Sequence, residues 1–244
     1  MRMSIVVPAH NEEDNIIEVI DRIEHYLDIQ SLDCELVVVN DHSTDATAEL
    51  VSKMSNQYIN IRLIENKLDK GFANALKTGF NNTLGDVVVP IMGDLCDDLS
   101  AIEIMFQKIN EGYDVVCGSR YTKGGARLGG SKIKGFFSCF VGVSLHYLLG
   151  LPTRDIGNAF KMYRKKVIDG IDIKSKGFEI SMEIPLKAHY LGFKITEVPT
   201  VWRERTKGKS NFRIFKLLPS YLKLYIWAIF KLVYTRIKSV RIRE

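Results

Sequence analysis

The N-terminal half of the chain alternates short apolar runs with segments of helical periodicity. In the segment 16–23, for example, Ile16, Val19, Ile20 and Ile23 recur at helical spacing. The apolar runs have the length and composition of buried strands and cover residues 4–8, 34–39, 61–64, 86–92 and 115–117. Strands that alternate with helices predict βαβ units and a largely parallel sheet, so the expected fold class is α/β. In the less regular second half, we expect a glycine-rich basic loop over 123–134 and a single strand over 194–202.

Polar side chains follow four of these five apolar runs, at the point where each strand is expected to end. They are His10 to Glu12, Asn40 and Asp41, Asp94 to Asp98, and Ser119 with Arg120. In open parallel sheets, ligands bind beyond the carboxyl ends of the strands. We therefore expect the four clusters to meet at one edge of the sheet and to form a binding site.

Three acids, Asp94, Asp97 and Asp98, come directly after the run at 86–92. Hard divalent cations prefer carboxylate oxygens, and such a cation neutralises the charge that develops on a diphosphate leaving group. Asp97 and Asp98 also precede a helix expected over 99–109, where acids interact favourably with the helix dipole. For these two, a binding role and a helix-terminus role both stay open, whereas Asp94 is assigned to the site.

Six segments, in order along the chain, resemble family 2 glycosyltransferases, and most of all the polyprenyl-phosphate or dolichol-phosphate mannosyltransferase branch. Any one of these motifs is weak, but six in the correct order are specific. They are 5–13 (like VVPAYNEE), 37–47 (VVVDDGSTDGT), 66–79 (NxGxxxAxxxG), 118–121 (GSRY), 154–160 (RDxxSGFR) and 204–210 (RxxGxSK).

This resemblance implies a GT-A fold, with a mostly parallel central sheet flanked by helices. It implies a catalytic domain over residues 1–212 and a basic amphipathic helix over 213–244. The implied reaction is transfer of a hexose, with inversion, from a GDP- or UDP-sugar to a polyprenyl-phosphate lipid.

The resemblance also implies roles for particular residues. Pro8, His10, Glu12 and Asp41 would line the nucleotide pocket. Gly93 and Asp94 would lie at the sugar diphosphate, with Asp94 also holding a divalent metal, Mg²⁺ or Mn²⁺. Arg120 and Arg205 would contact phosphates, for which the guanidinium fork is well shaped. Asp155 would lie near the acceptor, either as a base or to orient it.

The chain departs from the family pattern in the acidic motif DADLQ, where Met92 and Cys96 replace the first Asp and the Gln. Either Asp97 or Asp98 compensates, or the metal is weakly held, or the enzyme depends less on metal. This departure leaves open a non-catalytic protein that binds nucleotide sugars. Independently of it, transfer to a saccharide acceptor in surface-glycan assembly also stays open. A dinucleotide oxidoreductase is disfavoured because no GxGxxG follows the first strand.

The segment 214–240 is apolar and aromatic with lysines at intervals, and the chain carries a net charge of +5. This pattern is typical of a helix that lies in a membrane interface, although contact with a second subunit stays open. We expect no confident transmembrane helix and no nucleic-acid partner. The four cysteines are widely spaced, which fits a reducing compartment. The predicted location is the cytoplasm, peripherally on the cytoplasmic face of a membrane.

Overall fold

The computed structural model describes residues 1–30, 32–94, 96–204 and 214–241, and within the last range the side chains of 217–235. Its centre is a seven-stranded sheet in the order β3-β2-β1-β4-β7-β5-β8. The strands are β1 (Met3–Ala9), β2 (Cys34–Asn40), β3 (Ile61–Glu65), β4 (Val87–Pro90), β5 (Val115–Ser119), β7 (Lys161–Arg164) and β8 (Ile195–Pro199). Only β7 runs antiparallel to its neighbours within this sheet, β4 and β5. The predicted α/β class with a mostly parallel sheet is confirmed.

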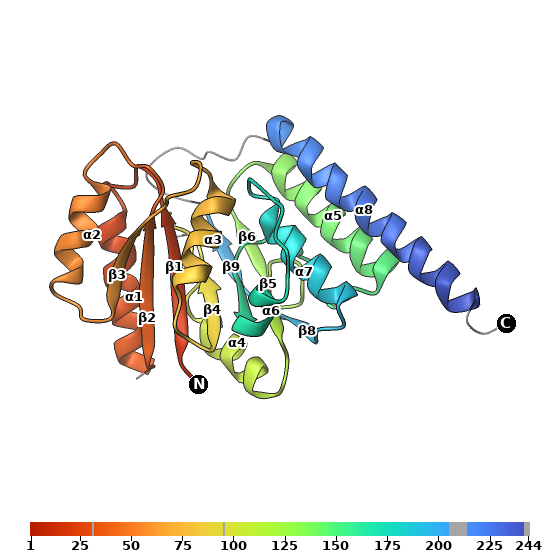
Figure 1. Cartoon of the computed structure of the whole chain (residues 1–244), viewed down its shortest axis with the longest axis horizontal. Helices are drawn as coiled ribbons and strands as arrows, with labels where there is room; N and C mark the ends of the chain where they lie inside the picture. Colours follow the sequence, from red (N-terminus) through yellow and green to blue (C-terminus); the bar gives the residue numbers. More distant parts are fainter. Residues whose placement is uncertain (31, 95, 205–213, 242–244) are drawn as a thin grey trace.

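Helices cover both faces of the sheet (Figure 1). One face packs against α1 (Ile16–Gln30), α2 (Thr47–Ser55) and α4 (Ala101–Asn110). The other face packs against α3 (Phe72–Asn82), α6 (Lys165–Asp169) and α7 (Ile180–Tyr190). Side chains of one strand alternate between the two cores: Ile5 and Val7 of β1 face the first, and Val6 faces the second.

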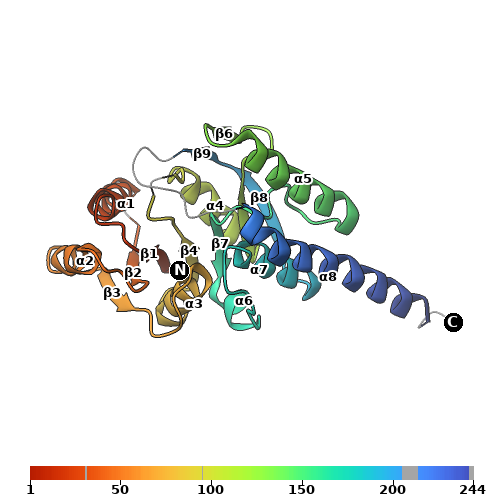
Figure 2. The same cartoon turned by 90° about the horizontal axis from the view of Figure 1, so that it is seen from above.

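Two long helices, α5 (Lys132–Leu149) and α8 (Ile214–Arg241), lie side by side at one end of the molecule (Figures 1 and 2). They share a third core, in which Leu145 and Leu149 of α5 meet Ala228 of α8. The hydroxyl of Tyr225 also donates to Ser144 Oγ at 3.1 Å. Much of the outer surface of both helices is apolar and left open.

The C-terminal half differs from the sequence-based expectation in two places. The single strand expected over 194–202 is divided at Thr200 into β8 and β9 (Val201–Arg203). The nitrogen of Thr200 donates to Ser119 O, and β9 then leaves the main sheet to pair with β6 (Ala126–Leu128). The glycine-rich segment expected to be a loop therefore contains a strand. In addition, the stretch Leu217–Thr235 of α8 is long and apolar enough to cross a membrane, by length and composition alone, which corrects the expectation of no such stretch.

Candidate functional site

The site lies where the chain order of the sheet reverses. From β1 the chain proceeds outward through β2 and β3, and then returns to the other side of β1 as β4. The return from β3 to β4 passes through α3 on one face of the sheet, while α1 and α4, which follow β1 and β4, lie on the other face. In open α/β sheets ligands bind beyond the carboxyl ends of the strands at such a point. Strands β1, β2, β4 and β5 are aligned there, and each is followed by one of the four polar clusters.

The loops after β1 and β2 are tied together by hydrogen bonds. Glu12 N donates to Thr47 Oγ1 at 2.9 Å, and Thr44 N donates to Asn11 Oδ1 at 2.8 Å. His10 Nδ1 lies 2.8 Å from the carbonyl oxygen of Asp41. Asn11 has a positive φ of 53°, a left-handed conformation that asparagine tolerates better than most residues. The predicted neighbours His10 and Asp41 are thus adjacent in space.

The carboxylate of Asp41 is buried and anchors the next loop. It accepts Asn66 Nδ2 at 2.7 Å and Gly71 N at 2.9 Å. Asn40, beside it, donates to Glu65 Oε2 at 2.7 Å. An Asp at position 40, as the family motif has it, would place two carboxylates against each other, so Asn40 suits this chain's Glu65.

Gly93, just after β4, lies close to the end of the neighbouring strand β1. A Cβ built at Gly93 would lie 3.5 Å from the carbonyl oxygen of Pro8 and 3.7 Å from Cγ of Glu12. Gly93 therefore lies next to both Pro8 and Glu12, two predicted nucleotide-sugar residues that are far from it in the sequence.

The three carboxylates that follow β4 have different surroundings. Asp98 Oδ1 accepts Ser100 N and Ser100 Oγ, at 3.2 and 2.7 Å, just before α4. Asp97 is buried and accepts Met92 N at 3.1 Å. Burial, and secondarily the charge of Asp94, raises the pKa of Asp97 to about 7. The geometry of Asp98 therefore fits a helix-terminus role, and Asp94 and Asp97 form the acidic pair of the site.

Arg120 and Asp155 form a two-pronged ion pair on the β5 side of the site. Arg120 Nε donates to Asp155 Oδ2 at 2.7 Å, and Nη2 donates to Oδ1 at 2.8 Å. The backbone nitrogen of Arg120 also donates to Oδ2, and Nη2 donates to Ser138 Oγ at 3.0 Å. Burial alone would lower the pKa of Arg120, but the charge of Asp155 raises it above the ordinary value.

The side chain of Asp155 has no exposed surface, and both its oxygens are engaged with Arg120. A general base must reach the proton that it removes. The sequence left two roles open for Asp155, a base and a group that orients the acceptor. The geometry is unfavourable for a base, and the group that Asp155 orients in the structure is Arg120.

Several side chains that sequence reasoning missed belong to the same cluster. Ser138 is a partner of Arg120, and Tyr121 has its ring 5.3 Å from the Arg120 guanidinium. Ser138 gave no signal because it sits within the apolar stretch of α5. Arg205, a predicted phosphate contact, lies outside the described residues.

The described residues contain no group of three or more His, Cys, Asp or Glu side chains arranged to hold a metal ion. Asp94 and Asp97 nevertheless lie close enough for the charge of one to raise the pKa of the other. Mg²⁺ is commonly held by one or two carboxylates together with substrate phosphates and water, and two carboxylates fit that pattern. The metal is thus compatible with the site, and the substrate would have to supply ligands.

A mostly parallel sheet whose strand order reverses at β1, with paired acids and a fixed guanidinium beyond its carboxyl edge, is the arrangement of a GT-A type fold. A structure of glucosyl-3-phosphoglycerate synthase from Mycobacterium tuberculosis, in complex with Mn²⁺, uridine diphosphate and glucosyl-3-phosphoglycerate, superimposes with a TM-score of 0.68. It is 21% identical and covers 94% of this chain and 79% of that one. At this identity the likeness shows the fold alone.

Residues 4–171 match the model of glycosyl transferase family 2, and the chain belongs to that family. A dolichol-phosphate mannosyltransferase of Pyrococcus furiosus is 33% identical over 238 residues, 93% of this chain and 64% of that protein. An undecaprenyl-phosphate 4-deoxy-4-formamido-L-arabinose transferase of Salmonella choleraesuis is 27% identical over 221 residues, 89% of this chain and 64% of that protein. The chain thus spans somewhat less than two thirds of the length of these relatives.

Proposed function

We propose that this chain is an inverting glycosyltransferase that moves a hexose from a GDP- or UDP-sugar to a polyprenyl phosphate. The observation that carries the proposal is the presence of two features at one sheet edge: the acids Asp94 and Asp97, and the buried Arg120–Asp155 ion pair. Two relatives named for lipid-phosphate acceptors support the acceptor class.

The acidic pair would serve the donor. Asp94 and Asp97 would hold Mg²⁺ or Mn²⁺, which when bound supplies positive charge to the leaving diphosphate. His10, Glu12 and Asp41 lie beside the crevice on the β1 and β2 side, where the nucleoside would bind. A structural neighbour crystallised with Mn²⁺ and uridine diphosphate supports a metal-assisted donor site.

The guanidinium of Arg120 would serve a phosphate group. Asp155 and Ser138 fix its Nε and Nη2 atoms, so the group is pre-oriented before any ligand arrives. In the proposed step an oxygen of the acceptor phosphate forms a bond to the anomeric carbon as the bond from that carbon to the diphosphate breaks. The acceptor phosphate is already anionic near neutral pH, so the step requires no strong base.

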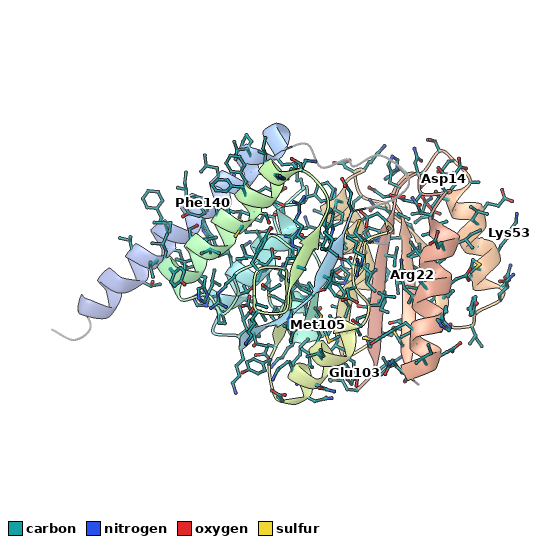
Figure 3. The ribbon with its side chains drawn as sticks, turned by 180° about the vertical axis from the view of Figure 1, so that it is seen from behind. Asp14, Arg22, Lys53, Glu103, Met105 and Phe140 are labelled. Carbon is teal, nitrogen blue, oxygen red and sulfur yellow. The ribbon has the colours of Figure 1, made fainter. Side chains whose placement is uncertain are left out.

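The apolar outer surface of α5 and α8 would seat the protein on a membrane. Six large side chains of α5 and six of α8 are well exposed: Ile133, Phe136, Phe137, Phe140, Tyr147, Leu148, Leu218, Leu222, Ile226, Phe230, Val233 and Tyr234. Lysines flank them on both helices, which suits an anionic lipid surface. Figure 3 places Phe140 at the end of the molecule opposite Asp14 and Lys53, so a membrane at α5 would leave the charged α1–α2 end in water.

The decisive experiment is a transfer assay with UDP- and GDP-sugars and a polyprenyl phosphate, with Mg²⁺, Mn²⁺ or EDTA. Asp94→Asn should reduce kcat/KM at least about a hundredfold, because a carboxylate at the leaving diphosphate is lost. Asp98→Asn is the matched control, since Asp98 lies in the same segment but is engaged with Ser100. Transfer to saccharide acceptors alone would refute the lipid acceptor. Tight nucleotide-sugar binding with no transfer to any acceptor would refute catalysis and favour a non-catalytic binding protein.

The membrane role is tested by co-sedimentation with vesicles of phosphatidylcholine and phosphatidylglycerol. Phe140→Ser should weaken vesicle binding roughly tenfold, because an inserted Phe contributes about 1.5–3 kcal/mol. Ile59→Ser is the control: Ile59 is equally apolar and fully exposed, but it lies between α2 and β3. Equal binding by wild type and Phe140→Ser, with a concentration-dependent dimer that Phe140→Ser disrupts, would instead assign the surface to a second subunit.

A further inference from the structure

Lys161, the first residue of β7, has a side chain with no exposed surface. Lysine is almost never fully buried, because removing its ammonium from water costs much free energy unless other groups compensate. Lys161 Nζ donates to the carbonyl oxygen of Ile156 at 2.9 Å and also to the carbonyl oxygen of Asn158. Both carbonyls belong to the segment that begins with Asp155, so the lysine is wrapped by the loop that carries the partner of Arg120.

The surroundings of Lys161 identify Asp155 as its counter-charge. Burial lowers the pKa of Lys161, while Cys117 and Asp155 act to raise it. Burial raises the pKa of the Cys117 thiol to about 11, so this thiol stays neutral near pH 7. Among the described groups whose charges act on Lys161, which are Cys117, Asp155 and Arg120, Asp155 therefore supplies the negative charge.

The charges alternate in sign from the interior of the sheet to the crevice. The order is Lys161, Asp155, Arg120 and Asp97: Asp155 binds Arg120 directly, and Arg120 is near enough to Asp97 to lower the pKa of that carboxyl. Nη2 of Arg120 is shared between Asp155 and Ser138, so a shift of Asp155 would move the guanidinium. In a low-dielectric interior such a row is worth more than its separate pairs, and loss of one member affects the next.

We propose that Lys161 is a positioning residue for the phosphate-binding guanidinium of Arg120. Its ammonium fixes the carbonyls of Ile156 and Asn158 and balances the charge of Asp155, which in turn holds Arg120 at the crevice. Lys161 does not touch the substrate. The inference rests on the proposed function insofar as Arg120 receives a phosphate, and the test separates the two.

The first measurement is binding of geranyl phosphate, a ten-carbon prenyl phosphate, by calorimetry. Lys161→Gln keeps a hydrogen-bond donor but loses the charge, and Lys161→Met loses both. Both should weaken binding about tenfold or more, since a displaced Arg120 no longer meets the phosphate in its fork geometry. Lys165→Gln is the matched control, because Lys165 Nζ also donates to a backbone carbonyl, that of Phe80, but lies away from Arg120. It should bind within about twofold of wild type.

A double-mutant cycle distinguishes positioning from a merely structural role. In an Arg120→Gln background, Lys161→Gln should change geranyl phosphate binding less than about twofold, because the group it positions is gone. An equal loss in both backgrounds would overturn the inference. Thermal unfolding of each variant is followed in parallel, and binding is measured well below the lowest melting temperature. Lys161→Arg keeps the positive charge and serves as a second variant if Lys161→Gln does not fold. It should bind geranyl phosphate within about threefold of wild type, and binding as weak as that of Lys161→Met would refute the charge argument.

Failure of the proposed function has a different signature. If wild type binds geranyl phosphate through Arg120 but transfers no sugar, the proposed catalysis fails while the positioning role of Lys161 is still decided by the binding data. If wild type does not bind geranyl phosphate, Arg120 is not a phosphate site and the inference about Lys161 is wrong. Unchanged binding in Lys161→Gln, beside a functional wild type, overturns the inference alone.

Discussion

The carboxyl edge of the sheet has two parts that are stabilised differently. The first edge, around His10 and Asp41, is held by hydrogen bonds between loops, whereas the second edge, around Arg120, is held by buried opposite charges. On the first side, backbone N–H groups meet hydroxyl and amide groups and the carboxylates of Asp41, Asp45 and Glu13, with no buried cation among these contacts. On the second side, Lys161, Asp155 and Arg120 are all largely removed from water. The net contribution of one hydrogen bond to the free energy of unfolding is about 1 kcal/mol, whereas an unpaired buried charge lowers that free energy by several kcal/mol. The two sides should therefore respond very differently to substitution.

The largest effect should come from Asp155→Asn, which leaves the buried cations of Arg120 and Lys161 without their counter-charge. Breaking one partner of a buried ion pair costs about 3–5 kcal/mol of unfolding free energy. The measurement is urea unfolding. Arg154→Gln is the control, since Arg154 pairs with Glu197 at 2.7 Å but its side chain is 40% exposed; it should cost at most about 1 kcal/mol. Equal losses in the two variants would contradict the contrast between the two edges.

A slightly smaller effect should come from Asp97→Asn. At alkaline pH this substitution should raise the free energy of unfolding, whereas Asp155→Asn lowers it. The pKa of Asp97 is raised to about 7 in the folded protein, against about 3.9 when unfolded. The folded state thus binds a proton that the unfolded state has lost, and the stability due to this group falls as pH rises from about 4 to about 7. Asp97→Asn has no carboxylate at this position, so its stability does not fall for this reason as the pH rises.

At pH 8 in EDTA, Asp97→Asn should therefore be more stable than wild type by on the order of 3–4 kcal/mol, and at pH 4 the two should be similar. The check is the unfolding free energy at both pH values. A wild type whose stability does not fall between pH 4 and pH 7, relative to the variant, would show that Asp97 ionises normally in the folded protein.

The difference between the two edges also explains what the sequence could predict. The first edge follows from local patterns: short apolar strands end in polar residues, and parallel strands bring those ends together. Pro8, His10, Glu12, Asp41 and Gly93 accordingly lie at the expected edge. The α/β class followed from the same alternation of strands and helices.

The second edge was less predictable because its contacts join elements far apart in the chain. Arg120 and Asp155 were identified individually through the family motifs, but nothing in the sequence indicated that they bind each other. Lys161 was not singled out from the sequence, and only its complete burial draws attention to it. The split between β8 and β9 was missed for a similar reason, since it depends on a hydrogen bond from Thr200 to Ser119 of another strand.

On the hydrogen-bonded edge, Asp41→Asn should have a moderate effect. The Asp41 carboxylate accepts from both Asn66 and Gly71, so an amide at this position turns a donor toward one of these two donors. A buried donor without an acceptor costs about 1–3 kcal/mol. Asp69→Asn is the control, because Asp69 lies between Asn66 and Gly71 in the loop after β3 but is exposed. Hydrogen exchange of the Gly71 amide is the specific measurement, and unchanged protection there would contradict the anchoring role of Asp41.

The smallest effect should come from Thr47→Val, which removes one hydroxyl from the ties between the loops after β1 and β2. Thr47 Oγ1 accepts Glu12 N and donates to Asp45 Oδ1 at 2.6 Å, and the side chain is buried. Valine fills the same volume, so the loss is that of hydrogen bonds alone, about 1–2 kcal/mol. Thr44→Val, at an exposed hydroxyl with a long 3.5 Å contact to Asn11, should cost less than about 0.5 kcal/mol. Comparing the two variants by urea unfolding measures how much the hydrogen bonds of the Thr47 hydroxyl contribute to the free energy of unfolding. If Thr47→Val instead cost as much as Asp155→Asn, the first edge would depend on its buried polar groups as strongly as the second depends on its charges, and the contrast drawn between them would be wrong.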